Sequence, residues 1–318
     1  MPNREWIKTL ISRHAPVDGI FQTKLPGLAL IRCSYPTFPM PAIYGPTLCI
    51  VAQGQKTAML GRTHFVFDEA SYLIASVDMP VVGAVTKAST AEPYLSMQLN
   101  LDRLELAELA DRYPLPAQPG KAATALLLGD IDPEVLDTAS RLLALLDRPQ
   151  DIAELAPLAK REIMYRLLTS PNSRTIRQMA NPRTHLSRIA RATQWMRSHY
   201  REASLVERAA EVAGMGRSTF FSHFRSITTM SPVEFRKQLR LQEARRLMLY
   251  DGVDVATAAF HVGYANPSHF SADFAKAFGA PPSRHVDLVR KLGHGKAFPS
   301  KTEPMPHAPQ EGYPTSDR

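Results

Sequence analysis

Two kinds of feature are scarce in this sequence: cysteines and long apolar runs. Only two cysteines, Cys33 and Cys49, occur among 318 residues, and no CxxC pair or cluster of cysteine and histidine surrounds them. This excludes a disulfide-stapled miniprotein and argues against a structural zinc site. No stretch approaches the about 18 to 20 consecutive apolar residues of a membrane span, and the N-terminus lacks the apolar core of a signal peptide. We therefore expect a soluble, cytoplasmic protein without a membrane partner.

The motifs of common catalytic sites are also missing. The sequence contains no GxSxG, P-loop, GxGxxG after a strand, or HExxH stretch. A metal centre in a β-barrel enzyme takes two or three histidines and a carboxylate, whereas the β-rich region holds His64 alone. Asp68 and Glu69 are adjacent in a predicted turn, where paired carboxylates are usually solvated. We expect no enzyme activity, no metal and no cofactor.

The positive charge is concentrated in one part of the chain. The length suffices for about two domains, and 38 basic residues face 30 acidic ones. Residues 1–182 hold 18 basic and 18 acidic residues, 183–290 hold 16 and 9, and 291–318 hold 4 and 3. Such asymmetry favours a polyanionic partner for the block 183–290, with nucleic acid first and an anionic membrane second.

Within this basic block one pattern occurs twice. LVERAAEVAGMGRSTFFSHF (205–224) is similar to DVATAAFHVGYANPSHFSADF (254–274), and the shared positions include a glycine, a serine and two phenylalanines. Each copy predicts a helix, a glycine in the left-handed conformation, a short turn and a second helix, which is a helix-turn-helix. Phenylalanines four residues apart place one face of each second helix in the core. These residues are Phe220 and Phe224, and Phe270 and Phe274.

The opposite face of each second helix is then available to DNA. In the first copy the candidate DNA-binding residues are Arg217, Ser218, Phe221, Ser222 and Arg225. In the second copy they are Asn266, Pro267, Ser268, Ser271, Ala272 and Lys276.

The segment between the two copies predicts one long helix. Ser231 and Pro232 form an N-cap and a proline at the first helical position of the segment 231–249. Such a helix could hold the two second helices about 34 Å apart, one turn of DNA. Its cations are expected near phosphates; they are Arg236, Lys237, Arg240, Arg245 and Arg246.

These motifs resemble the AraC/XylS-type DNA-binding domain. The residues that carry the likeness are GMGRSTFFSHFRSITTMSP, RLQEARRLML and VGYANPSHFSADFAKAFGAPP, and residues 46–81 are similar to the cupin-like N-terminal sensing domain of one AraC subgroup. The resemblance implies a seven-helix unit with two helix-turn-helix motifs that binds DNA. Family members usually carry arginine at Ser222 and often at Ala272. Base readout here is therefore expected to use thymine-methyl contacts, for which Phe221 is suited, and DNA shape.

The N-terminal part shows a period-two pattern in short runs. Runs of this kind, separated by turn residues, predict an all-β barrel or sandwich whose mouth is a usual place for a small ligand. The runs are 28–33, 47–54, 56–61, 64–70, 71–76, 81–89 and 94–99. The fold class is thus α+β with two domains: an N-terminal cupin-like β-barrel followed by an all-α DNA-binding domain with two helix-turn-helix motifs.

The expected domains are a sensing domain at 1–112, a helical connector at 113–182, the DNA-binding domain at 183–290 and a disordered tail at 291–318. Helical spacing at 99–112, 133–147 and 157–169 suits either pairing with a second chain or packing on the chain's own barrel. Turn residues at 170–184 indicate the domain boundary. Cys33 and Cys49 are expected to be packed, with an electrophile- or redox-sensing role as the alternative.

The sequence therefore predicts a sequence-specific, DNA-binding transcriptional regulator controlled by a small molecule in the barrel. Its expected partners are double-stranded promoter or operator DNA, an unidentified small-molecule effector and a second copy in a homodimer, with RNA polymerase as a further candidate. Two alternatives remain: a cupin-type metal enzyme with an accessory DNA-binding domain, and a non-specific nucleic-acid-binding protein. The residues do not distinguish activation from repression.

Overall fold

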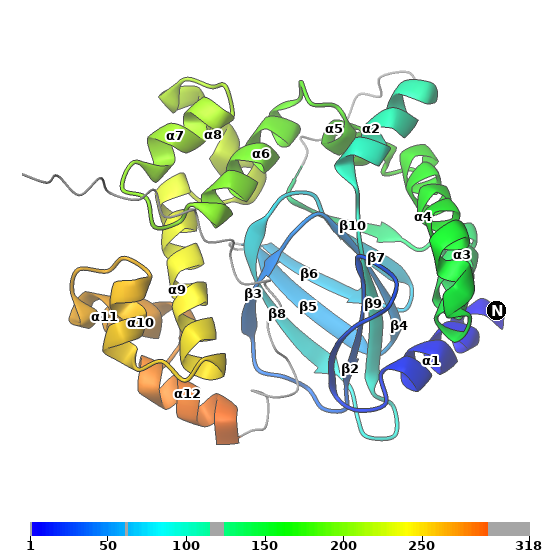
Figure 1. The fold of residues 1–318 in the computed structure, drawn as a ribbon, viewed down its shortest axis with the longest axis horizontal. Helices are drawn as coiled ribbons and strands as arrows, with labels where there is room; N and C mark the ends of the chain where they lie inside the picture. The colour runs from blue at the N-terminus through cyan, green and yellow to red at the C-terminus, as the bar shows by residue number, and fades with distance from the viewer. Residues whose placement is uncertain (1, 61–62, 115–123, 292–318) are drawn as a thin grey trace, which may run out of the picture.

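Two antiparallel sheets form the N-terminal half of the protein (Figure 1). The structure, a computed structural model, describes residues 2–60, 63–114 and 124–291, so the tail expected at 291–318 lies almost entirely outside the described residues. In spatial order the first sheet contains β1 (Gly19–Gln22), β2 (Leu28–Cys33), β9 (Tyr94–Asn100), β4 (Thr47–Gln53), β7 (Ser71–Ala75) and β10 (Leu126–Asp130). The second contains β3 (Met40–Tyr44), β8 (Met79–Lys87), β5 (Gln55–Leu60) and β6 (Thr63–Asp68).

All seven expected β-runs form strands, and the described residues contain three further strands. These three are β1, β3 and β10; each is short, β3 contains Pro41 and β10 contains Gly129, so none shows a strong alternating pattern. Pairing with a neighbour stabilises each of them. The strand β10 lies inside the segment 113–182, where only helices were expected, and it pairs with β7 in the register Leu126↔Ala75. The first sheet is therefore completed by a strand from beyond residue 112.

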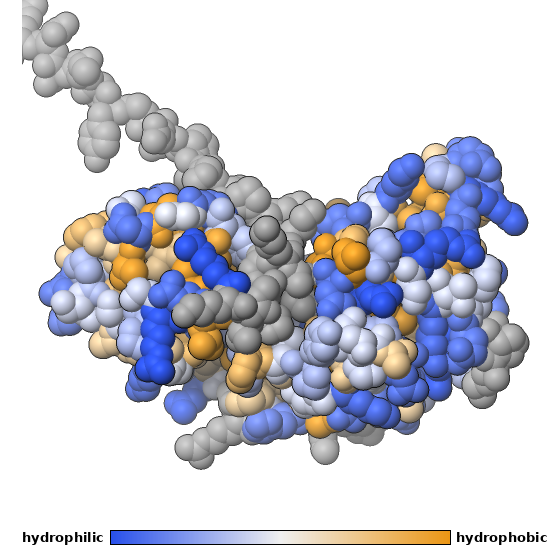
Figure 2. All heavy atoms as spheres, turned by 90° about the horizontal axis from the view of Figure 1, so that it is seen from below, coloured by the Kyte–Doolittle hydropathy of each residue, from blue (hydrophilic) through white to orange (hydrophobic). Residues whose placement is uncertain are grey.

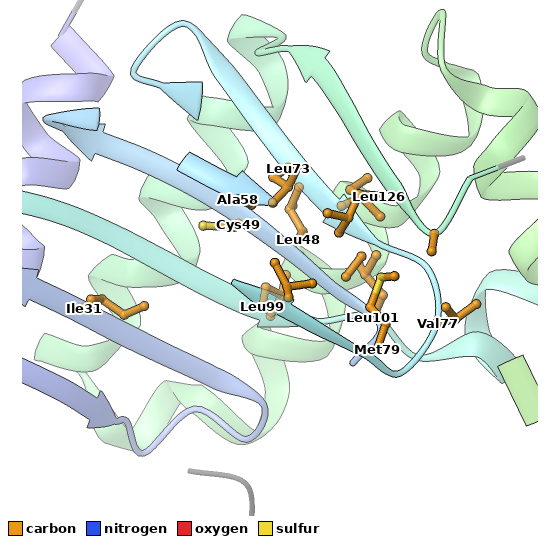
Figure 3. Packing of buried hydrophobic residues seen from close by; sticks show 14 of the residues in the cluster. Ile31, Leu48, Cys49, Ala58, Leu73, Val77, Met79, Leu99, Leu101 and Leu126 are labelled. Carbon is orange, nitrogen blue, oxygen red and sulfur yellow. The ribbon is translucent and has the colours of Figure 1, made fainter. Parts of the chain in front are cut away.

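The six-stranded sheet is buried on both faces. Its inner face meets the second sheet, and its outer face packs against α1 (Pro2–His14), whose Ile7, Leu10 and Ile11 are fully buried. Figure 3 shows side chains of this core, among them Leu48 and Leu99 from neighbouring strands. Burial on both faces explains why β4 consists mainly of apolar residues instead of alternating strictly.

Helices cover this sheet and lead to the C-terminal half. They are α2 (Arg103–Arg112), α3 (Pro133–Ala144), α4 (Ile152–Thr169) and α5 (Ser173–Ala180), with two short 3₁₀ turns, Leu145–Asp147 and Pro149–Asp151, before α4. Asp102 and Asp132 cap α2 and α3 by accepting backbone N–H bonds. The helix α5 lies in the segment expected to consist of turns. Its Ile176 and Met179 are buried, and it packs against α2, so tertiary contact outweighs the weak local signal.

Seven helices form the C-terminal half among the described residues. They are α6 (His185–Ser198), α7 (Leu205–Val212), α8 (Arg217–Thr228), α9 (Pro232–Tyr250), α10 (Val255–His261), α11 (Pro267–Phe278) and α12 (Pro282–Lys291). The long helix expected at 231–249 is confirmed as α9, with the Ser231 Oγ accepting from the Glu234 N–H at 3.2 Å and Pro232 in the first turn. In Figure 1 the pairs α7–α8 and α10–α11 lie toward opposite ends of α9.

Candidate functional site

The two helix-turn-helix units have the backbone that their repeat predicts. Gly214 and Gly263 follow α7 and α10 with φ of 61° and 87°, the left-handed conformation that glycine adopts without strain. Phe220 and Phe224 on α8 are fully buried with ring centroids 5.3 Å apart, and the equivalent rings of α11 are 5.5 Å apart and equally buried. The expected core faces of both second helices are therefore confirmed.

Each turn is also held by an arginine that sequence reasoning missed. Arg188 of α6 donates from Nε to the Ala213 carbonyl at 2.6 Å and from Nη2 to the Gly214 carbonyl. Arg240 of α9 donates from Nη1 to the Gly263 carbonyl at 3.1 Å. A Cβ on Gly263 would lie 3.0 Å from Arg240 Nη2, and the φ of 87° strains any residue other than glycine at this position. The sequence contains one signal for these contacts: an arginine precedes each turn glycine by a similar number of residues.

The candidate DNA-binding residues of α8 lie at the surface. Ser218, Ser222 and Arg225 are exposed, and Phe221 is half-buried against Phe220 at a centroid distance of 6.3 Å. Arg217 is exposed, pairs with Glu207 at 2.8 Å, and places its guanidinium 5.6 Å from the Phe221 ring centre. Exposed Thr219 adjoins this group.

The second helix α11 presents a smaller and more neutral surface. Ser268, Ala272 and Lys276 are exposed, whereas Pro267 and Ser271 are half-buried. Asn266 has a structural task as the N-cap, since its Oδ1 accepts from the Ser268 N–H at 2.7 Å. His269 is also exposed. The sequence analysis did not select it because the two copies of the repeat carry different residues at this position.

The expectation that the α9 cations lie at phosphates is wrong for Arg245, and the other four contact groups of the protein. Arg245 is 6% exposed and donates to His285 Nε2 at 2.9 Å. The other four bind groups of the protein: Arg236 the Glu202 and Ala203 carbonyls, Lys237 the Asp273 carboxylate, Arg240 carbonyls that include Tyr200 and Gly263, and Arg246 the carboxylates of Glu243 and Asp251. The reason is that both helix-turn-helix units and α12 pack around α9, which turns its cations inward.

A cavity of about 1300 Å³ lies between the sheets and the C-terminal helices. Strands β1, β2, β3, β5, β8 and β9 line it on one side, and α2, α6 and α9 on the other. Its apolar lining includes Ile20, Ile31, Met40 and Val85, and its volume is large enough for a small ligand. Elsewhere on the molecule, the face shown in Figure 2 mixes hydrophilic side chains with small apolar patches.

Cations predominate among the charged residues of the cavity wall. The cationic residues are Lys56, Arg103, Arg191, Arg197 and Arg245, and the acidic ones are Asp78 and Asp102. Asp78 forms an ion pair with Arg197 of α6 at 2.7 Å, and Asp102 is occupied as the α2 cap. Burial lowers the pKa of Arg103, whose Nη2 donates to the Ser187 carbonyl of α6 at 3.3 Å. The wall is therefore net positive, and its polar contacts connect the β-rich half to α6.

The two cysteines are buried, as expected, and lie far from each other. Burial raises the pKa of both thiols, which disfavours the reactive thiolate. Cys33 pairs with Tyr94 and Cys49 with Gln98, on opposite sides of β9 and four residues apart along it, which is too far for a disulfide. His64 is exposed, and no group of three or more metal-ligating side chains occurs among the described residues.

Comparisons with known proteins found relatives for both the β-rich half and the helical half of the chain. Residues 24–175 match the family described as AraC-type transcriptional regulator N-terminus, and residues 209–287 match a helix-turn-helix domain family. The chain is 26% identical over 153 residues to the HTH-type transcriptional activator RhaS of Escherichia fergusonii, covering 48% of this chain and 54% of that one. It is 32% identical over 105 residues to the RCS-specific activator RclR of Escherichia coli K12, covering 33% and 37%. The chain thus spans about half the length of the RhaS relatives.

Solved structures show the same two-part fold. The ligand-free form of a ToxT point variant from Vibrio cholerae aligns with a TM-score of 0.55 at 10% identity, covering 84% of this chain and 99% of that one. Wild-type ToxT bound to an unsaturated fatty acid aligns with a TM-score of 0.51 at 12% identity, covering 81% and 94%. The architecture is that of a two-domain protein with a β-rich N-terminal domain and a paired helix-turn-helix domain. Residues 24–175 are thus similar to the N-terminal domain of AraC-type transcriptional regulators, and residues 209–287 are similar to a helix-turn-helix domain.

Proposed function

We propose that this protein is a transcriptional regulator that binds specific sites on double-stranded DNA under the control of a small molecule in the cavity. The observation that carries the proposal is the pair of helix-turn-helix units, each with its second helix exposed, held at opposite ends of one helix. The protein acts on DNA without catalysing a reaction, and it works in the cytoplasm. No helix within the described ranges is long and apolar enough to cross a membrane.

The DNA contacts divide by residue type. Arg225 and Lys276 are exposed cations on the two second helices and bind phosphates. Ser218, Phe221 and Ser222 of α8 meet base edges, as do Ser268 and Ala272 of α11, with Ser271 and Pro267 beside them. Arg217 supports Phe221 and is free to contact phosphate once it leaves Glu207. Asn266 orients α11.

The effector combines an apolar body with a negative charge. Aliphatic residues and an excess of cations share the cavity wall, so both parts find complementary groups. The fatty acid bound by ToxT, a protein of the same fold, supports this choice. Because α6 and α9 form part of the wall, an occupant that contacts them favours one placement of the helix-turn-helix units over another.

Genomic mapping of the sites occupied by the full-length protein tests its specificity. A mapped site should bind at least about a thousandfold more tightly than a scrambled duplex of equal composition. We expect this ratio of specific to non-specific affinity to lie at the lower end of its usual range, because Ser222 and Ala272 are short and uncharged. Equal binding to both duplexes would make the protein a non-specific nucleic-acid binder, and stoichiometric metal in the purified protein would favour the metal-enzyme alternative.

We further propose a homodimer formed through α4. Its inner face packs on α3, but Leu155, Leu158 and Tyr165 remain 46%, 63% and 39% exposed, with the last two one heptad apart. Leu158→Glu should convert a dimer into a monomer in sedimentation velocity, whereas Val17→Glu, at a 64% exposed position outside this stripe, should not. A monomeric wild-type protein at micromolar concentration contradicts the dimer.

RNA polymerase is the proposed further partner. RhaS and RclR are both described as activators, which supports recruitment of polymerase by the DNA-bound protein.

A further inference from the structure

The last turn of α8 is completed by a group from the β-rich half of the protein. The backbone N–H of Ala125, one residue before β10, donates to the Ile227 carbonyl at 3.1 Å. The last four carbonyl groups of a helix have no partner within the helix, so other groups must bind them. Ala125 is 0% exposed and Ile227 is 5% exposed, so the bond is shielded from water. Ala125 therefore caps the helix that carries the proposed base contacts of the first helix-turn-helix unit.

The C-terminus of α8 needs outside support more than that of α11 does. Both helices end at a residue in the left-handed conformation, with φ of 63° at Thr229 and 77° at Gly279. Glycine adopts this conformation without strain, whereas a β-branched residue such as threonine rarely does. Among the described residues, Thr229 is the only one other than glycine with a positive φ. The first copy of the repeat thus ends in a strained cap, and the second ends in an unstrained glycine cap.

The connection between β7 and β8 holds Ala125 in place. The Ser76 N–H donates to the Ala125 carbonyl at 2.8 Å, and Ser76 Oγ donates to the carbonyls of Thr124 and Ala125 at 3.1 and 3.2 Å. Ser76 is fully buried. Val77 is also buried, in the same core as Leu126 of β10 (Figure 3). The position of the capping N–H is thus fixed by residues 76 and 77.

The same connection reaches α6 through its next residue. Asp78 is buried, lines the cavity and pairs with Arg197 of α6 at 2.7 Å. The helix α6 in turn packs against both α7 and α8. Three consecutive residues, 76–78, therefore connect the cavity wall to two helices of the first helix-turn-helix unit.

The second helix-turn-helix unit is attached differently. Its helices α10 and α11 pack on α9, as does α12. None of the described residues in 251–291 lines the cavity, whereas α9 contributes Arg245. A shift of the cavity wall therefore acts on the second unit through α9, but it acts on α8 through a direct hydrogen bond.

We propose that the β-rich domain controls the first helix-turn-helix unit by capping α8 through residues 76–78 and Ala125. With the cap in place, α8 keeps its last turn and binds DNA. When the cavity wall moves and the cap is lost, this unit loses order while the second unit keeps its DNA contacts. The assignment rests on the proposed role of the cavity as an effector site, and it adds which of the two units the effector regulates.

Hydrogen exchange of the full chain tests the cap. Ala125→Pro removes the capping N–H, since proline has no backbone donor and is tolerated at the start of a strand. Exchange in the last turn of α8, residues 224–229, should rise about fivefold, while residues 274–279 of α11 should stay unchanged. Ala125→Gly keeps the N–H, so this matched control should change neither. Ser76→Ala adds no atom to the core and should raise exchange in α8 in the same direction.

A second substitution tests the strain in the cap. Thr229→Gly places in α8 the residue that ends α11, so it should make the last turn of α8 independent of Ala125. Added to Ala125→Pro, it should return the exchange at 224–229 to the wild-type level.

Fluorescence anisotropy on a mapped site links the cap to DNA binding. Ala125→Pro should bind this duplex about fivefold more weakly than the wild type, and the added Thr229→Gly should restore the affinity. The half of the site that α8 contacts is the half at which Phe221→Ala loses affinity. With that half scrambled, the wild type and Ala125→Pro should bind equally, because only the contacts of α8 depend on the cap.

The cap is overturned if exchange at 224–229 does not rise relative to 274–279 in either Ala125→Pro or Ser76→Ala. An equal loss of affinity on the scrambled duplex would overturn control of the first unit. If the cap fails while the wild type still prefers the mapped site, the proposed regulator stands. If exchange in α8 rises as expected but the wild type does not distinguish the mapped site from a scrambled duplex, the proposed function fails and the cap remains.

Discussion

Phe224→Ala should lower the free energy of unfolding of the helical domain by about 3 to 5 kcal/mol. Its ring is fully buried and lies 5.3 Å from the rings of both Phe220 and Phe235, so it joins α8 to α9. Alanine would leave a cavity at this junction that the surrounding helices cannot fill. Thermal and denaturant unfolding of the full chain measure the loss.

Phe221→Ala is the comparison for this prediction, since it changes the neighbouring residue of the same helix. Phe221 is only half-buried, so its removal should cost less stability than the loss of Phe224. It should instead weaken binding to a mapped site by about tenfold, the effect of one lost base contact of about 1 to 3 kcal/mol. Ser222→Arg should raise general DNA affinity. If Phe221→Ala melts the domain and Phe224→Ala does not, the orientation of α8 assigned here is inverted.

Raising the salt concentration should weaken DNA binding by about a hundredfold between about 50 and 200 mM, if about four phosphates are neutralised. This number is well below the 16 basic residues of 183–290 because the α9 cations are turned inward. Each exposed cation that contacts a phosphate releases counterions when DNA binds. Fluorescence anisotropy at a series of salt concentrations yields the slope.

Two matched variants distinguish a cation that contacts phosphate from a cation that stabilises the fold. Arg225→Gln removes an exposed cation and should reduce the slope of log affinity against log salt by about one. Arg240→Gln removes a cation that holds the Gly263 turn, so it should lower stability and leave the slope nearly unchanged. A flat salt response of the wild type would contradict the phosphate contacts altogether.

Patterns that act over a few residues were sufficient for much of the fold. The turn glycines Gly214 and Gly263, the phenylalanines four residues apart, and the Ser231–Pro232 start of α9 all depend on local backbone geometry. The seven β-runs with good propensity are strands for the same reason. These local rules led to the resemblance to AraC-type regulators and to the exposed faces of both second helices.

Contacts between distant segments decided the remainder. β10 and α5 have weak local signals and form because β7 and α2 offer them partners. A row of arginines on a helix has the same sequence whether it faces DNA or the protein interior, and only the packing around α9 shows that it faces inward. The cavity likewise exists only where strands and helices far apart in the chain converge. Its wall joins residues of both sheets to residues of α2 and α6, because the fold brings together residues that no local period relates.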